Sequence, residues 1–202
     1  MTFADGYHDL PAGKVAVVVT SLEMHARPVP GTGDSERPKF TIRPRPAPTV
    51  DWYRDLYARI GADWLWFSRL RLSATELDGI IRDPNVHIWA LQHEGRDEGL
   101  LELDFRVAGE CELAFFGVTR SLIGRGAGRA LMDRAITEAW NQPIHRFWVH
   151  TCTGDHPGAP EFYVRSGFVP FARQIEIFDD PRLTGLVPET AAPHVPLIRP
   201  KA

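Results

Sequence analysis

Three glycines at alternate positions, between an apolar segment and an amphipathic one, constrain this chain more than any other feature. Residues 112–118 ahead of them read as a strand, and the residues behind them repeat apolar side chains at helical spacing until Pro143. At a helix start, free backbone amides and the helix dipole favour an anion, and glycine lets the backbone approach it closely. The sequence therefore predicts a strand, a phosphate-binding loop and a helix in succession. The loop consists of Ile123, Gly124, Arg125, Gly126, Ala127, Gly128 and Arg129.

The glycines alone would also fit an ordinary strand-to-helix turn that binds nothing. Two other phosphate-binding motifs fit poorly. A P-loop requires lysine and then serine or threonine after its last glycine, whereas Gly128 is followed by Arg129 and Ala130. A dinucleotide-binding fingerprint requires its third glycine one position later. The nucleotide-binding readings are therefore set aside.

The composition is typical of a single soluble domain. The 202 residues suffice for one substantial core, and 44% of them are hydrophobic. A formal net charge of −3 without a cluster of Lys and Arg argues against a nucleic-acid partner. Cys111 and Cys152 are too few for a disulfide framework, and the apolar run Val15–Val19 is too short to cross a membrane. We therefore expect a cytoplasmic protein with no membrane partner.

Periodicity and turn residues predict the order of the elements. Ser73 and Glu76 form a capping-box pattern at one helix start, and Gly61 ends the helix before it. Helices are expected at residues 53–60, 74–81, up to 140 after the glycine loop, and 159–166. Strands are expected at residues 14–24, 40–42, 86–91, 100–105, 112–118, 147–152 and 171–178.

The chain is expected to consist of one domain with an N-terminal extension. Residues 1–38 would form a strand and a flexible loop rich in Pro and Gly, attached to a domain at residues 39–202. The strand at 14–24 would join a sheet edge or cover the domain. The tail from Pro188 onward would be extended.

A second segment follows the glycine loop: Phe162, Tyr163, Val164, Arg165, Ser166, Gly167 and Phe168. Together the two segments resemble the GNAT superfamily of N-acetyltransferases. In that superfamily a Gln/Arg-x-x-Gly-x-Gly/Ala loop follows a central strand, and a Phe-Tyr and a Gly-Phe pair bracket the end of a short helix. Ile123 departs from the pattern, because the family usually has Gln or Arg there. The resemblance implies an α/β (α+β) acyltransferase fold: a mixed, mostly antiparallel twisted sheet with helices on both faces, split near the end of strand 112–118.

The resemblance also implies acetyl-coenzyme A as cosubstrate and no metal. Phe116, Gly117 and Val118 would line its acetyl-pantetheine arm, and residues 123–129 would hold its pyrophosphate. His156 stands where many relatives have Asn near the cofactor. The segment 150–156 lacks the ligand spacing of a metal site, so we expect a strand end and a loop near the active site.

Acetyl transfer to an amine requires a base, a polarised carbonyl and a proton for the departing thiolate. The resemblance places the phenol of Tyr163 beside the cofactor sulfur as the acid, with amphipathic packing as the alternative role. The amide of Phe116 or a neighbour would donate to the developing oxyanion. Glu112 matches a position that some relatives use as general base. The alternatives for the base are Glu102, Asp104 and His150.

Side-chain alternation places Glu112 on the same strand face as Ala114, Phe116 and Val118. On a straight strand Glu112 would lie about 13 Å from Phe116, so a bulge or a water relay is required. A further group of aromatic residues would either shape the acceptor pocket or pack in the core. These residues are Trp64, Trp66 and Phe67.

The expected activity is direct transfer of an acetyl group from acetyl-coenzyme A to a small-molecule or peptide amine in a ternary complex. Two alternatives stay open. One is a catalytically silent module that binds or senses acetyl-coenzyme A. The other is transfer to a hydroxyl, or of a longer acyl group. The sequence does not name the acceptor, and it leaves a homodimer open.

Overall fold

The computed structural model describes residues 4–28 and 40–201, whose seven strands form a single sheet. The strand order is β2, β3, β4, β5, β6, β1, β7. All neighbours are antiparallel except β5 and β6, which run parallel. The mixed, mostly antiparallel sheet predicted from the sequence is confirmed. The strands are β1 (Lys14–Met24), β2 (Thr41–Pro44), β3 (Val86–His93), β4 (Arg96–Asp104), β5 (Glu110–Val118), β6 (Arg146–Cys152) and β7 (Val169–Asp179).

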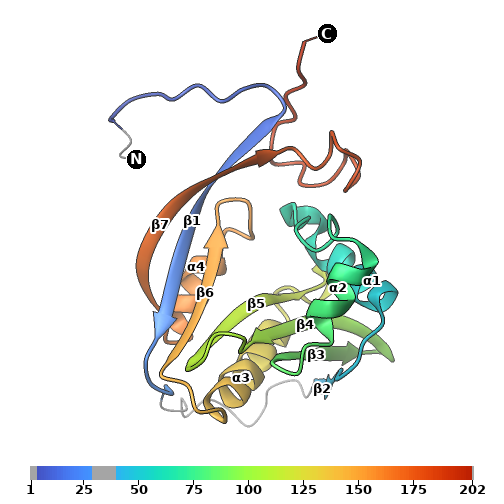
Figure 1. The fold of residues 1–202 in the computed structure, drawn as a ribbon, viewed down its shortest axis with the longest axis vertical. Coiled ribbons are helices and arrows are strands. Elements are labelled where there is room, and N and C mark those ends of the chain that lie inside the picture. The colour runs from blue at the N-terminus through green and yellow to red at the C-terminus, as the bar shows by residue number, and fades with distance from the viewer. Residues whose placement is uncertain (1–3, 29–39, 202) are drawn as a thin grey trace.

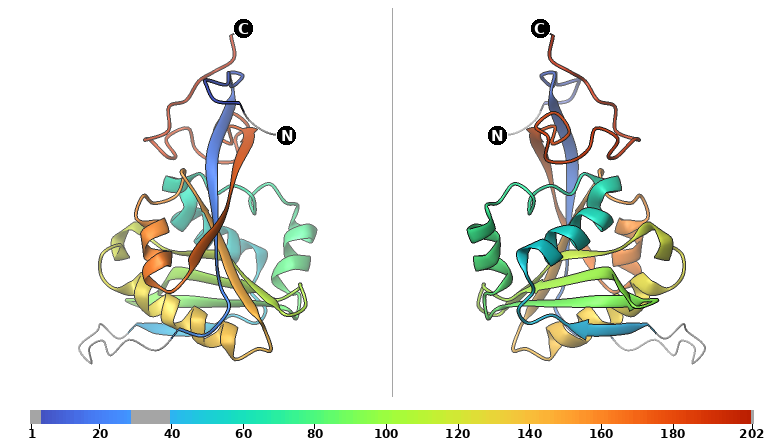
Figure 2. Two further views of the ribbon diagram at one scale, coloured as in Figure 1. Left: turned by 90° about the vertical axis from the view of Figure 1, so that its left-hand side faces the viewer. Right: turned by 90° about the vertical axis from the view of Figure 1, so that its right-hand side faces the viewer.

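Helices cover both faces of the sheet, as expected. Figure 2 shows α1 and α2 on one side and α3 and α4 on the other. The predicted capping box forms at the start of α2, where Ser73 Oγ accepts from the Glu76 amide at 3.2 Å and Glu76 Oε2 accepts from the Ser73 amide at 2.8 Å. The helices are α1 (Val50–Gly61), α2 (Ala74–Ile81), α3 (Ala127–Trp140) and α4 (Ala159–Arg165), with 3₁₀ turns η1 (Ala62–Trp64) and η2 (Arg120–Leu122).

Each face of the sheet has its own hydrophobic core. On the α1 and α2 face, Tyr53, Leu56 and Tyr57 are fully buried against β3 and β4. On the opposite face, Leu131 and Met132 of α3 are fully buried against β4, β5 and β6. Full burial of a large apolar side chain contributes roughly 1.5–3 kcal/mol, so these two layers fix the central strands between the helices.

Two expectations about the ends of the chain are wrong. Strand β1 does not lie at a sheet edge: it pairs with β6 on one side and with β7 on the other, so β7 is the edge strand. The tail is not simply extended, because residues 181–195 form turns that bury Val187 and Ala192 against the α1–α2 connection. In Figure 1 this tail lies beside the start of β1, so the first and last described segments lie at the same end of the molecule. The predicted loop rich in Pro and Gly and the boundary at 38 fall almost wholly outside the described residues.

The hairpin between β3 and β4 is tighter than expected. The strands expected at residues 86–91 and 100–105 would leave residues 92–99 between them, but only Glu94 and Gly95 lie between β3 and β4, both with positive φ (49° and 79°). Such a two-residue turn matches the twist of the strands it joins. No helix among the described residues has both the length and the apolar character that crossing a membrane requires.

Candidate active site

The site lies where β5 and β6 separate. Their parallel pairing consists of Glu110 with Arg146, Cys111 with Phe147, and Glu112 with Trp148, and it ends there. Beyond this point the strands diverge, and a cavity of about 720 Å³ opens between them. One edge of β5 is consequently unpaired from residue 113 onward, so alternate backbone amides face the opening. The predicted split is present, but it begins after Glu112, the third residue of β5, and not near the end of that strand.

The glycine loop closes one side of this cavity. Gly124 and Gly126 have φ values of 78° and 81°, which only glycine adopts readily, and Gly126 is the N-cap of α3. The Ala130 amide donates to the Gly126 carbonyl at 3.1 Å and completes the first helical turn. The amides ahead of it have no acceptor within the helix, and Gly124, Gly126 and Gly128 all line the cavity. The loop therefore has the geometry of the predicted anion cradle.

A side chain at Gly128 should weaken cosubstrate binding without harming the fold. An added Cβ there meets only the ring of Phe162, at 4.0 Å, so Gly128→Val is sterically accepted. Its methyl groups would enter the space in front of the helix amides and prevent close approach of a pyrophosphate. We expect the Kd for acetyl-coenzyme A, measured by calorimetry, to rise at least about tenfold, or 1.4 kcal/mol.

The matched control is Gly79→Val in α2, where an added Cβ meets nothing within 4 Å and which does not line the cavity. That variant should keep the parent Kd. Equal affinities of all three proteins would reject the loop as the pyrophosphate site.

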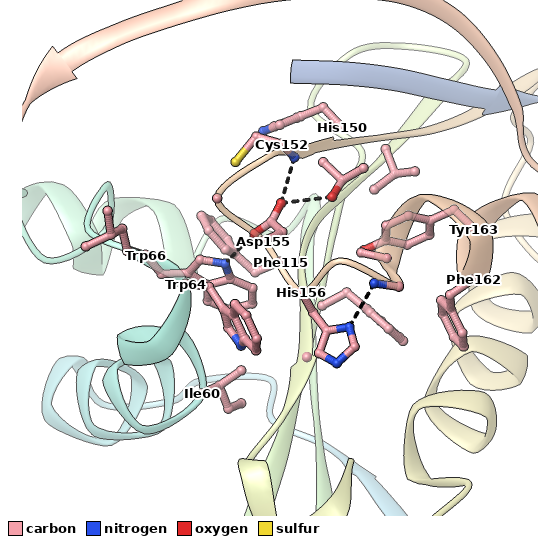
Figure 3. A pocket seen from close by; sticks show the side chains of 18 of the residues that line it. Ile60, Trp64, Trp66, Phe115, His150, Cys152, Asp155, His156, Phe162 and Tyr163 are labelled. Carbon is pink, nitrogen blue, oxygen red and sulfur yellow. Dashed lines mark hydrogen bonds between the residues drawn. The ribbon is translucent and has the colours of Figure 1, made fainter. Parts of the chain in front are cut away.

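Tyr163 lies on the same side of the cavity, on α4. The residue is 7% exposed, and its ring packs 6.2 Å from Phe116 and 5.9 Å from Phe168, measured between ring centroids. Within the described part of the chain, its hydroxyl has no hydrogen-bond partner. Burial, and secondarily the negative charge of Asp155, raise the pKa of Tyr163, which keeps the phenol protonated. The structure thus presents a protonated donor to the cavity (Figure 3).

A bulge in β5 corrects the expected alternation. Glu102 pairs with Phe115 and Leu103 pairs with Leu113, so Ala114 has no partner on β4. From Ala114 onward, the alternation of side chains between the two faces of the sheet is shifted by one residue. Leu113 and Phe116 both belong to the α3 and α4 core, whereas Phe115 packs on the α1 and α2 side. The prediction that Glu112 shares a face with Phe116 is therefore wrong, because a bulge shifts every following residue by one.

Glu112 lies outside the cavity wall and contacts a residue that lines it. Glu112 Oε1 is 3.5 Å from Nδ1 of His150, which lines the cavity and is half exposed. This contact is the largest cause of a raised pKa of His150 relative to its ordinary 6.5. The parallel register produces the pair, because Glu112 aligns with Trp148, two residues before His150. Two of the base candidates therefore form one unit.

The other two base candidates lie in ion pairs away from the cavity. Glu102 is fully buried, accepts from Arg69 Nη2 at 2.5 Å and also accepts from the Tyr53 hydroxyl. Asp104 accepts from Arg106 Nη2 at 2.6 Å. Neither lines the cavity. A carboxylate held by an arginine is a poor proton acceptor, because the positive charge favours its ionised form.

Aromatic side chains from the α1–α2 connection form the wall opposite α4 (Figure 3). Trp64, Trp66 and Phe67 all line the cavity, so the aromatic segment contributes to the pocket wall. Trp66 Nε1 donates to Asp155 Oδ1 at 3.1 Å, and Asp155 Oδ2 accepts from Thr151 Oγ1 at 2.9 Å. Asp155 therefore fastens this wall to the end of β6.

His156 also lines the cavity and contacts Gly158 and Trp64. Nδ1 of His156 accepts from the Gly158 amide at 3.0 Å, and its ring meets Trp64 edge-on at 5.2 Å.

Sequence reasoning missed Asp155 and Glu176, which line the cavity from the β6–α4 turn and from β7. For Asp155 the available signal was an Asp directly after a Gly at a strand end, a pattern typical of turns. Glu176 gave no local signal, because its position depends on the pairing of β7 with β1.

Across residues 4–28 and 40–201, no group of three or more His, Cys, Asp or Glu side chains is arranged to hold a metal ion.

Comparison with known proteins agrees with this geometry. The profile of the acetyltransferase (GNAT) family matches residues 47–168, more than half of the chain. Among solved structures, a GNAT-family acetyltransferase from Novosphingobium aromaticivorans has a TM-score of 0.57 at 13% identity, with 83% of this chain and 67% of that chain covered. A GCN5-related N-acetyltransferase from Sphaerobacter thermophilus has a TM-score of 0.54 at 19% identity, with 81% and 51% covered, so this chain spans about half of its length.

A third structure carries a ligand. A GNAT-family acetyltransferase from Elizabethkingia anophelis, solved with acetyl-coenzyme A bound, has a TM-score of 0.51 at 18% identity, with 66% of this chain and 78% of that chain covered. At such identities the structures support the fold alone. No curated protein matches the chain in sequence. The family profile, the glycine-opened helix and the divergence of β5 from β6 lead to one conclusion: the chain belongs to the GNAT family of acetyltransferases.

Proposed function

We propose that the chain transfers an acetyl group from acetyl-coenzyme A directly to an amine in a ternary complex. The observation that carries the proposal is the opening between β5 and β6, which has the glycine-opened helix α3 and the protonated Tyr163 on one side and the His150 and Glu112 pair at its base. The residues present fit acetyl-coenzyme A, because the loop offers unpaired helix amides and the cavity is mostly apolar. When bound, the cosubstrate supplies the acetyl group as a thioester.

Each proposed step is assigned to a residue that lines the cavity or contacts a residue that does. Neutral His150 accepts the proton of the acceptor ammonium at Nε2, while Glu112 holds Nδ1 and stabilises the imidazolium that forms. Amides on the open edge of β5, with Phe116 as the candidate, donate to the oxygen that becomes negative. The bond from carbon to nitrogen forms, and the bond from carbon to sulfur breaks as Tyr163 gives its proton to the leaving sulfur. The extra proton on the nitrogen then returns to the Tyr163 oxygen, so the products are an amide, a free thiol and protonated His150. In this scheme Glu112 acts through His150 and positions it.

The remaining site residues have supporting roles in the same proposal. Gly117 and Val118 line the approach to the reacting carbonyl, and Ile123, Arg125, Ala127 and Arg129 complete the loop around the pyrophosphate. A single domain at residues 39–202, a cytoplasmic location and a homodimer stay predictions.

An acceptor screen tests the proposal. The protein is incubated with acetyl-coenzyme A and a panel of amines, amino acids, polyamines and peptides, and free thiol release is measured together with the mass of the product. We expect stoichiometric thiol release and a stable amide with at least one amine. Cosubstrate binding without transfer to any acceptor would favour a sensing module, and a base-labile ester product would favour hydroxyl acylation.

A further inference from the structure

The cavity has two chemically different halves. Helices α3 and α4, with the glycine loop, form the half assigned to the cosubstrate. The other half is formed by α1 and its connection to α2, by β1 and by β7. Its wall is largely aromatic and aliphatic, and side chains from β1, α1, β5, β7 and the α1–α2 connection meet there. They include Val17, Tyr57, Trp66, Phe67, Phe115 and Phe178.

The charges of the two halves also differ. Among the described residues lining the cavity, the arginines and lysines are Arg129 and Arg165, and both belong to the cosubstrate half. The acceptor half instead carries carboxylates. The Asp155 carboxylate is already engaged, because it accepts hydrogen bonds from Trp66, from Thr151 and from the Cys152 amide.

Glu176 is the carboxylate that remains available. It lies on β7 opposite Val17 of β1, is exposed and lines the cavity. Within residues 4–28 and 40–201 it forms no ion pair with an arginine or lysine. It is close enough to His150 to act on that ring electrostatically. A carboxylate at an apolar opening that is also lined by the proposed base His150 is suited to hold an ammonium group.

We propose that the acceptor is a primary amine with an apolar, ring-bearing body and no acidic group, and that Glu176 binds its ammonium before His150 removes the proton. This inference rests on the proposed function. The aromatic wall would contact the ring, and aromatic faces also attract an ammonium. A carboxylate on the acceptor would enter a half-cavity without a cation to pair with it, which disfavours amino acids and acidic peptides.

The test compares matched amines at saturating acetyl-coenzyme A, with the amide product quantified by mass spectrometry. The probes are 2-phenylethylamine, phenylalanine, which adds only a carboxylate to it, and glucosamine, a primary amine on a polar, hydroxylated ring. We expect kcat/KM for 2-phenylethylamine to exceed that for phenylalanine by about 10- to 100-fold. Glucosamine should also be the poorer acceptor.

The variant Glu176→Gln tests the residue itself. We expect the KM for 2-phenylethylamine to rise about tenfold, because a charged hydrogen-bond partner is lost, while the Kd for acetyl-coenzyme A stays unchanged. The matched control is Asp179→Asn on the same strand, whose carboxylate pairs with Lys14 at 2.6 Å outside the cavity. It should leave both constants at their parent values.

Three outcomes would overturn the inference, and they are distinguishable from each other. Equal or better use of phenylalanine or glucosamine would refute the acceptor class and leave amine acetylation standing. An unchanged KM in Glu176→Gln would remove the ammonium site from Glu176. Failure of every amine, in the presence of bound acetyl-coenzyme A, would refute the proposed function together with the inference.

Discussion

Tyr163→Phe should lower kcat by about 10²-fold with acetyl-coenzyme A and an accepted amine at saturation. Loss of a general acid typically reduces a rate by about 10² to 10⁴, and a thiolate is a fair leaving group, which places this case at the lower end. The ring stays in its packing against Phe116 and Phe168, and the hydroxyl has no partner within the described residues. The melting temperature should therefore change little, and the loss should fall on turnover.

The measurement requires steady-state kinetics and calorimetry on the same preparations. The Kd for acetyl-coenzyme A should differ from the parent by no more than a small factor. Full activity in the Phe variant would show that water or the substrate protonates the thiolate. Tyr163 would then be a packing residue.

His150→Gln should cost about 10²- to 10⁴-fold in kcat/KM, the typical contribution of a positioned general base. His150 is half exposed, so its replacement should not destabilise the fold. The pH dependence of kcat/KM should show which protonation state of His150 is active. The base is active when neutral, so kcat/KM of the parent should rise with pH through a value above 6.5, because Glu112 raises the pKa of His150. The variant should lack this acidic limb.

Glu112→Gln separates positioning from proton transfer. The neutral amide no longer favours the imidazolium, so the pKa of His150 falls and the acidic limb should move to lower pH. Activity at high pH should decline less than in His150→Gln. His93→Gln is the control, since this histidine on β3 does not line the cavity. A limb that stays in place in both the His150 and Glu112 variants would assign the proton to another group, or to the acceptor itself.

Local signals in the sequence predicted the parts of the site that lie within one continuous segment. The glycine loop and the start of α3 follow from residues 123–129, where backbone freedom and helix periodicity act over a few neighbours. The capping box at Ser73 and the short helix with Tyr163 are local in the same sense. In these segments, hydrogen bonds between near neighbours decide the conformation.

The parts that failed depend on pairing between distant strands. The bulge at Ala114 exists only in the register of β5 against β4, and it reversed the expected facing of Glu112. The contact of Glu112 with His150 comes from the parallel register of β5 and β6, and Glu176 reaches the cavity because β1 lies between β6 and β7. A one-residue change of register moves a side chain to the other face, so alternation within a single strand cannot determine such positions.

Calorimetric titration of the protein with acetyl-coenzyme A tests the central claim most directly, because every proposed step requires that cosubstrate in the opening between β5 and β6. We predict one molecule bound per chain, an affinity weakened by Gly128→Val but not by Gly79→Val, and a melting temperature that rises with cosubstrate concentration by mass action. No heat of binding and no rise in melting temperature at millimolar acetyl-coenzyme A would contradict the account.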